Sequence, residues 1–270
     1  MNLDATHIAI RERGFAEVMD LALKVIRAHL GPLVLCGLAG AAPWAVINGL
    51  LLDGMVSDLD IWDQTPWFLT LMGLLVAVET PLATAPITLY MGQVTFQDQT
   101  DPRRILGDLL QSLPQLLWHV AFRAVMAVTF IGLVLPYGFA PFTQELILLE
   151  RNPMLPGKEK RMTTRRRSRN LHKSASGDLF GHWLAALCSG VLLVLALVGG
   201  LHTAASQLGG YEISRTQLIT VLVPICVWMV VCYFAVVRFL AYLDLRIQRE
   251  GWEVELKMRS EAARLARGMA

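Results

Sequence analysis

Two acid–base pairs stand inside long apolar segments of this 270-residue chain. Glu79 and Arg123 lie near the middle of two expected helices, at depths that place them level with each other. Glu145 and Arg238 each lie about 8–9 Å inside one membrane boundary. A charge in hydrocarbon is costly, so we expect Glu79 and Arg123 to form either a proton or ion site or a buried ion pair. Glu145 and Arg238 are a second candidate pair, although Arg238 could instead reach the headgroups alone. The few polar residues around Glu79 and Arg123 favour the structural role.

Side chains for catalysis or metal binding show no recognisable arrangement. The chain has no Walker loop and no HExxH, GxSxG or CxxC motif. Its histidines are scattered without metal-ligand spacing, and its four cysteines lie in apolar segments, where cysteine packs as a small apolar residue. We therefore expect a protein that is not an enzyme and that has no cofactor and no metal site.

A basic segment, residues 151–177, carries nine Lys or Arg residues and one Glu. Anionic headgroups at the cytoplasmic leaflet attract such a cluster by about 1 kcal/mol for each basic residue near the surface. The alternative is that the cluster only sets the topology. No aromatic residues are interleaved, so the expected partners are membrane lipids and other membrane proteins rather than nucleic acid. The expected contacts are Lys158, Lys160, Arg161, Arg165, Arg166, Arg167, Arg169 and Lys173.

Long apolar segments have to position all of these residues. The chain is 54% hydrophobic and only 17% charged, whereas soluble domains are about a quarter charged. Several runs of roughly 20 residues with almost no charge are long enough to cross a bilayer. The sequence therefore predicts an all-α polytopic membrane protein, with spans at about 30–52, 67–92, 115–135, 139–150, 180–203 and 217–241.

The region 115–150 could hold one long span or a hairpin of two. The turn signal Pro136-Tyr137-Gly138 favours the hairpin. The positive-inside rule favours it too, because a single span would place the basic segment outside. With six spans and both termini in the cytoplasm, 21 of the 24 Lys and Arg residues lie in cytoplasmic segments. No cleavable signal peptide is expected at the N-terminus.

A polar, partly amphipathic segment leads into each pair of spans. The three lead-ins are 12–29, which has the pattern of an interfacial helix, 101–113 and about 161–179. Gly31-Pro32 is expected to end the first and Pro114 the second. The sequence thus predicts three elbow-helix-plus-hairpin units: a cytoplasmic N-terminus 1–29, a membrane domain 30–246 that includes the basic segment, and a cytoplasmic helix 247–270.

Several segments resemble one known family. They are APFTQELILLERNP followed by RRRSRNLHKS and GHWLAAL, and the closing stretch VVRFLAYLDLRIQREGWEVEL. With the alternation of lead-ins and hairpins over 12–257, they resemble the bacterial glycerophosphodiester phosphodiesterase membrane-domain family. The resemblance implies six membrane helices with cytoplasmic elbow helices in a bacterial cytoplasmic (inner) membrane, and Glu150 at the end of the fourth span. It implies no phosphodiesterase activity, because six spans leave no room for the separate catalytic barrel of that family.

Two functions fit these features. The first is a non-enzymatic scaffold or accessory subunit that binds lipids or partner proteins. The alternative is a small-solute, proton-coupled or lipid transporter with a polar site near Glu79 and Arg123. A water-filled cavity that reaches Glu79 would favour transport, whereas a packed interior with Glu79 on Arg123 would favour the scaffold.

Overall fold

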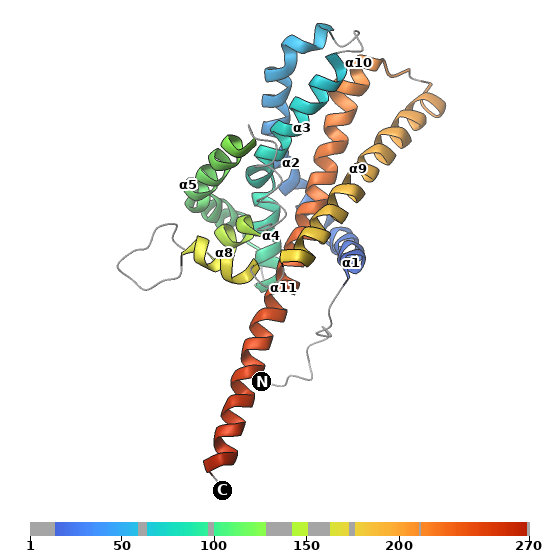
Figure 1. Ribbon diagram of the computed structural model, residues 1–270. Helices are drawn as coiled ribbons and strands as arrows, with labels where there is room; N and C mark the ends of the chain where they lie inside the picture. The colour runs from blue at the N-terminus through green and yellow to red at the C-terminus, as the bar shows by residue number, and fades with distance from the viewer. Residues whose placement is uncertain are drawn as a thin grey trace.

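The chain folds as a bundle of helices. A computed structural model describes residues 14–58, 64–96, 100–127, 142–150, 163–172, 176–210 and 212–268, and within these ranges all regular structure is helical (Figure 1). Four of the described helical stretches are long and apolar enough to cross a membrane: Leu30–Val56, Thr65–Phe96, Gly177–Gln207 and Arg215–Gln248. The all-α membrane class predicted from the sequence is therefore confirmed.

The first two helices meet at His29. α1 (Phe15–Ala28) is amphipathic, as predicted, and it buries Val18 and Ala22 against α11. α2 (Leu30–Leu52) follows after the single residue His29 and ends in the 3₁₀ turn η2 (Asp53–Asp58). The break therefore precedes the expected Gly31-Pro32 step, because proline is tolerated in the first turn of a helix, where no helical acceptor awaits its missing N–H.

The second apolar stretch is kinked. α3 (Gln64–Ala83) and α4 (Ala85–Phe96) are separated only by Thr84. Backbone hydrogen bonds from Thr84 to Thr80 and from Thr88 to Thr84 carry the chain through the kink, at 2.9 and 3.1 Å. The expected span 67–92 therefore lies in one bent path, with Pro81 and Pro86 on either side of the bend.

The next helix differs from the prediction. α5 (Pro102–Ala127) runs through Pro114 and joins the lead-in 101–113 to the start of the expected span 115–135. The helix does not end at Pro114, because a helix in an apolar environment can absorb a proline as a local distortion. The turn Pro136-Tyr137-Gly138 lies outside the described residues. Of the expected span 139–150, the described part forms α7 (Thr143–Glu145) and the π-helical turn η3 (Leu146–Glu150).

The remaining helices form the other half of the bundle. α8 (Thr164–His172) is a short basic helix, and α9 (Ser176–Gln207) contains the expected span 180–203. α10 (Arg215–Gln217) and the π-helical turn η4 (Leu218–Leu222) lead into α11 (Val223–Gly268), a continuous helix of 46 residues. The expected cytoplasmic helix 247–270 is therefore the continuation of the last span.

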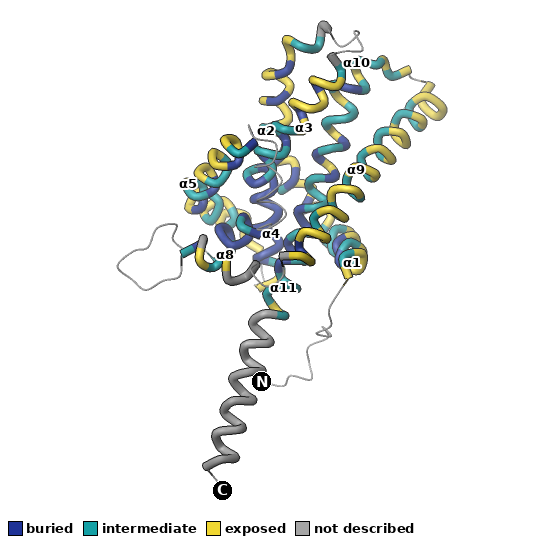
Figure 2. The backbone as a smooth tube through the Cα atoms, viewed as in Figure 1, coloured by how far each residue is buried: buried dark blue, intermediate teal, exposed yellow. Residues whose placement is uncertain are grey.

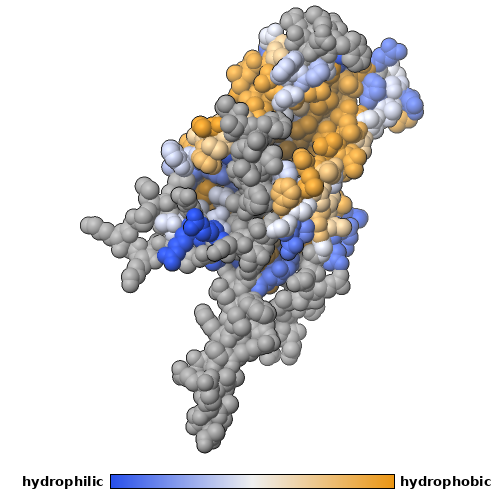
Figure 3. Space-filling model, in the orientation of Figure 1, coloured by the Kyte–Doolittle hydropathy of each residue, from blue (hydrophilic) through white to orange (hydrophobic). Residues whose placement is uncertain are grey.

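α11 lies at the centre of the bundle. It packs against α1, α4 and α9, and the largest buried cluster joins its residues Ala235–Phe239 to α1, α2 and α4. Figure 2 shows α4 and the middle of α11 largely buried, whereas α9 is exposed over most of its length. Figure 3 shows apolar surface over the body of the bundle and hydrophilic residues around α8. This apolar surface is what a lipid-facing exterior requires.

The connections sort to two ends of the molecule. In Figure 1 η2 and α10 lie at the upper end, whereas α1, α8 and the C-terminal part of α11 lie at the lower end. The described elements expected in the cytoplasm therefore share one end, and two of the three connections expected outside share the other, while the third, at 136–138, lies outside the described residues.

Candidate functional site

Arg238 is the centre of a buried polar network. Its Nε donates to Oε1 of Glu145 at 2.5 Å, and its Nη2 donates to Oε1 of Gln144. Gln144 in turn donates from Nε2 to Oγ1 of Thr84 at 3.0 Å, so the network ties the α3–α4 kink to α11. The Glu145 side chain is fully buried and that of Arg238 is 17% exposed. The structure thus brings Glu145 and Arg238 together as an ion pair.

A second network lies one helical turn farther along α11. Tyr242 donates to Oε1 of Glu150 at 3.0 Å, and Arg167 of α8 grips both oxygens of the same carboxylate, at 2.8 and 3.0 Å. Such a bidentate pair fixes both position and orientation. Arg167 therefore docks α8 on the end of η3, and its expected contact with headgroups stays a prediction.

The rest of the basic cluster is only partly described. Arg166 and Arg169 are exposed on α8, as headgroup contacts would require. The side chain of Arg165 is not described, and Lys158, Lys160, Arg161 and Lys173 lie outside the described residues.

Glu79 and Arg123 do not form the expected pair. Glu79 is buried and accepts a hydrogen bond from Nδ2 of Asn48 on α2 at 2.8 Å. Arg123 is also buried, but it donates from Nη2 to the backbone carbonyl of Ala77. Ala77 is two residues before Glu79, so the predicted depth agrees with the structure. The direction of the Glu79 side chain does not agree with the prediction. Residues two apart point to nearly opposite sides of a helix, so Ala77 faces α5 while Glu79 faces α2.

Pro81 explains where Arg123 goes. Proline has no N–H, so Pro81 cannot donate the usual helical hydrogen bond to the carbonyl of the residue four positions earlier, Ala77. Arg123 of α5 supplies the donor across the helix interface. A proline in a span, with an arginine at the same depth on a neighbouring span, is a sequence signal for this contact that reasoning on charge pairs overlooks.

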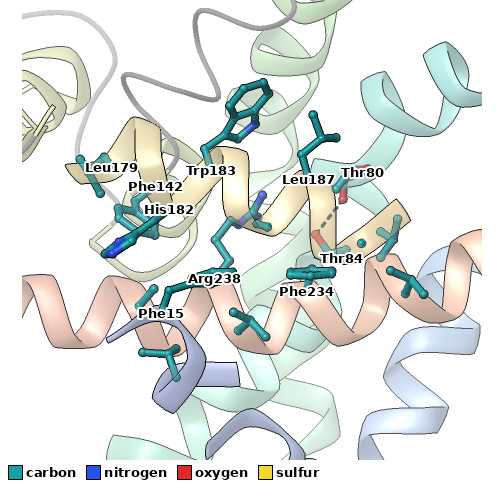
Figure 4. Close-up of a pocket in the computed structure, with 18 of the residues that line it drawn as sticks. Phe15, Thr80, Thr84, Phe142, Leu179, His182, Trp183, Leu187, Phe234 and Arg238 are labelled. Atoms are coloured by element: carbon teal, nitrogen blue, oxygen red, sulfur yellow. Dashed lines mark hydrogen bonds between the residues drawn. The ribbon is translucent and has the colours of Figure 1, made fainter. Parts of the chain in front are cut away.

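A large cavity borders Arg238. It has a volume of about 1320 Å³ and is lined by α1, α3, α9 and α11. Figure 4 shows Arg238 extending from α11 towards Trp183 of α9, with Phe15 of α1 and His182 of α9 near one end. The rings of Phe15 and His182 stack with centroids 5.8 Å apart. The cavity exists because α9 packs mainly on α11, while α3 packs on α2 and α5.

The cavity lining is amphipathic along its length. Apolar residues from the middle of three candidate spans line one part, among them Val76, Val191 and Val230. The end near α1 is lined by polar residues of α9 and α11, namely Asp178, His182, Arg238, Asp244 and Gln248. Small residues make the space: a Cβ added at Gly73 or Gly181 would meet no atom within 4 Å. The sequence analysis did not identify this cavity, because lining residues from four helices share no local pattern.

The described residues hold no group of three or more His, Cys, Asp or Glu side chains that could bind a metal ion. The chain has no match among protein-family models, curated proteins or solved structures. The resemblance to the glycerophosphodiester phosphodiesterase membrane-domain family therefore stays a prediction, and function has to be argued from the site.

Proposed function

We propose that this chain is a non-enzymatic integral membrane protein that binds lipid in the cavity between α3, α9 and α11, and acts as a scaffold or accessory subunit. The cavity is the observation that carries the proposal. Its volume of about 1320 Å³ exceeds the roughly 300–1,000 Å³ of pockets for drug-sized ligands. An apolar space of this size, within helices long enough to span a bilayer, suits acyl chains.

We further propose that the chain has six spans arranged as three elbow-helix-plus-hairpin units in a bacterial inner membrane, with both termini in the cytoplasm. Four apolar helical stretches support four of these spans. α5 and η3 would contribute to the third and fourth. The concentration of Lys and Arg in the expected cytoplasmic segments supports the orientation.

The transport alternative receives less support from the cavity. Neither Glu79 nor Arg123 is among its lining residues. Each of these side chains is instead held by a neighbouring helix, Glu79 by Asn48 and Arg123 by the Ala77 carbonyl. A route past both residues would have to open inside a packed interface between α2, α3 and α5.

Filling the cavity tests lipid binding directly. Leucines at Gly73 and Gly181 project into open space, so they should occupy the cavity without a clash. We expect the double variant Gly73→Leu, Gly181→Leu to lose about tenfold in bound lipid, since excluding two methylenes costs about 1.6 kcal/mol. Lipid that co-purifies in mild detergent, counted by native mass spectrometry, gives the readout.

Gly199→Leu is the matched control. Gly199 is also on α9 with open space around it, but it does not line the cavity. This variant should keep the wild-type lipid content. Equal lipid content in the cavity-filling and control variants would mean that lipid binds elsewhere, and would overturn the proposal.

A further inference from the structure

We propose that Glu79 binds a proton within the membrane and is held as a neutral carboxylic acid, which pairs with the Asn48 side chain through two reciprocal hydrogen bonds. The site joins α2 to α3 and lies apart from the cavity, because neither residue lines it. The inference therefore goes beyond the proposed lipid binding and does not depend on it. Three features carry it: the burial of the carboxyl group, the lack of a cation beside it among the described residues, and an unpaired amide oxygen on Asn48.

The Glu79 carboxyl group has a single hydrogen-bond partner among the described residues. The side chain is 6% exposed, and its Oε2 accepts from Nδ2 of Asn48 at 2.8 Å. Glu79 lies near the middle of the apolar stretch Thr65–Phe96, where an ionised side chain is most costly. A buried carboxylate is stable only beside a cation or with several donors, and one amide N–H is too little. The surroundings of this carboxyl group therefore favour the neutral acid.

No cation among the described residues compensates Glu79. α3 packs against α2, α4, α5, α11 and η2, and of these α2, α4 and η2 contain no Lys or Arg. On α5, Arg123 donates to a backbone carbonyl on the far side of α3, and on α11, Arg238 is paired with Glu145. The acid Asp53 on η2 can only favour a proton on Glu79. Other titratable side chains on these elements have no interaction with Glu79, among them Cys36, Tyr90, His119, Cys226 and Cys232.

Asn48 presents an acceptor that lacks a donor. Its side chain is 5% exposed, and its Oδ1 is buried without a hydrogen-bond partner. An ionised Glu79 has only acceptors to offer this oxygen. A protonated carboxyl group adds one O–H donor beside the amide, so a single proton removes the buried charge and also gives Oδ1 its partner. The acid and the amide then exchange two hydrogen bonds, one in each direction, across the α2–α3 interface.

Infrared spectroscopy of the full chain in mild detergent tests the inference, because the C=O stretch of a protonated carboxyl group is distinct from the bands of a carboxylate. At about pH 7, exposed Asp and Glu side chains are ionised. We expect the wild-type protein to show a protonated-carboxyl band that shifts when the chain is made with isotope-labelled glutamate. Glu79→Gln should lose this band and still fold, because a neutral amide can make both hydrogen bonds to Asn48.

Glu145→Gln is the matched control, since Glu145 is also fully buried but is paired with Arg238. It should leave the band in place. Asn48→Ala should keep the band and move it to higher frequency, because the acid loses its hydrogen-bond partner. The absence of a glutamic acid band in the wild-type protein, where no variant has to fold, would overturn the inference. A band that persists in Glu79→Gln, or that does not move in Asn48→Ala, would overturn it as well.

Discussion

The guanidinium of Arg123 donates to a backbone carbonyl to which Pro81 cannot donate. Pro81 cannot donate to Ala77, and Arg123 on α5 takes its place. An arginine buried in an apolar bundle therefore contacts the backbone at a helix kink and does not pair with Glu79. This use of a charge in the membrane needs no proton or ion pathway.

The contact can be tested by restoring the missing N–H. In the wild-type background, Arg123→Met should lower the free energy of unfolding in detergent by about 1–2 kcal/mol, because the Ala77 carbonyl loses the hydrogen bond that Arg123 donates. In a Pro81→Ala background the new backbone N–H can serve Ala77, so the same substitution should cost about 1 kcal/mol less. Other contacts of Arg123 are lost in both backgrounds and cancel in this cycle.

Pro86→Ala provides the control background for this cycle. Pro86 lies beyond the kink and frees the carbonyl of Leu82, which Arg123 does not contact. The full cost of Arg123→Met should persist there. Equal costs in all three backgrounds would show that Arg123 stabilises the bundle by some other contact.

The depth of a buried polar residue along its span could be predicted from the sequence, but the direction in which its side chain points could not. Counting residues along two spans placed Arg123 within two residues of its real partner, Ala77. Whether a side chain points towards α2 or α5 depends on helix rotation, which follows from packing among all helices. Glu145 and Arg238 do meet, because each also lies on a face that packs against the other.

At the scale of elements, the closest packing joins α2 to the α3–α4 kink. A Cβ built on Gly40 would lie 1.9 Å from the carbonyl oxygen of Ala83, far inside van der Waals contact. Glycine at this position lets the two backbones approach, as small residues do in membrane helix pairs. The kink therefore fits against α2 only because Gly40 has no side chain.

Two glycines of α2 should respond to alanine with opposite signs. Gly40→Ala should lower the melting temperature in detergent, because overpacking against a backbone atom costs about 1–3 kcal/mol. Gly49→Ala should leave it unchanged or raise it, since no atom lies within 4 Å and alanine favours the helix by about 0.5–1 kcal/mol. Thermal unfolding of both variants measures the difference. A tolerated Gly40→Ala would mean that α2 and the kink are not in close contact.

Hydropathy predicted the positions of the apolar helices more accurately than it predicted the residues at which helices end. Four expected spans coincide with long described helices, because the cost of exposing polar groups to lipid leaves a strong pattern. The expected helix end at Pro114 is wrong. Polarity changes where a chain leaves the membrane, but hydrogen bonding along a helix can continue past that point, as it does in α11.

The whole molecule has two chemically different ends. Among the described elements, the lower end in Figure 1 carries α1, α8 and the end of α11, and the upper end carries η2 and α10. A reporter active only in the cytoplasm should therefore work after Ala270 or near Met162, and should fail near Ser57 or Gly209. Activity at Ser57 would reverse the orientation proposed here.

The continuity of α11 has a mechanical consequence. The helix runs without interruption from Val223, inside the bundle, to Gly268, so its last 20 residues carry its end about 30 Å beyond Gln248. Such a rod converts a small rotation into a large displacement: a tilt of about 10° at the bundle moves the tip by about 5 Å. Arg238 and the other cavity-lining residues of α11 lie on the part of this helix that packs against α1, α4 and α9. Any repacking of the helices around the cavity is therefore magnified at the far end of the same helix.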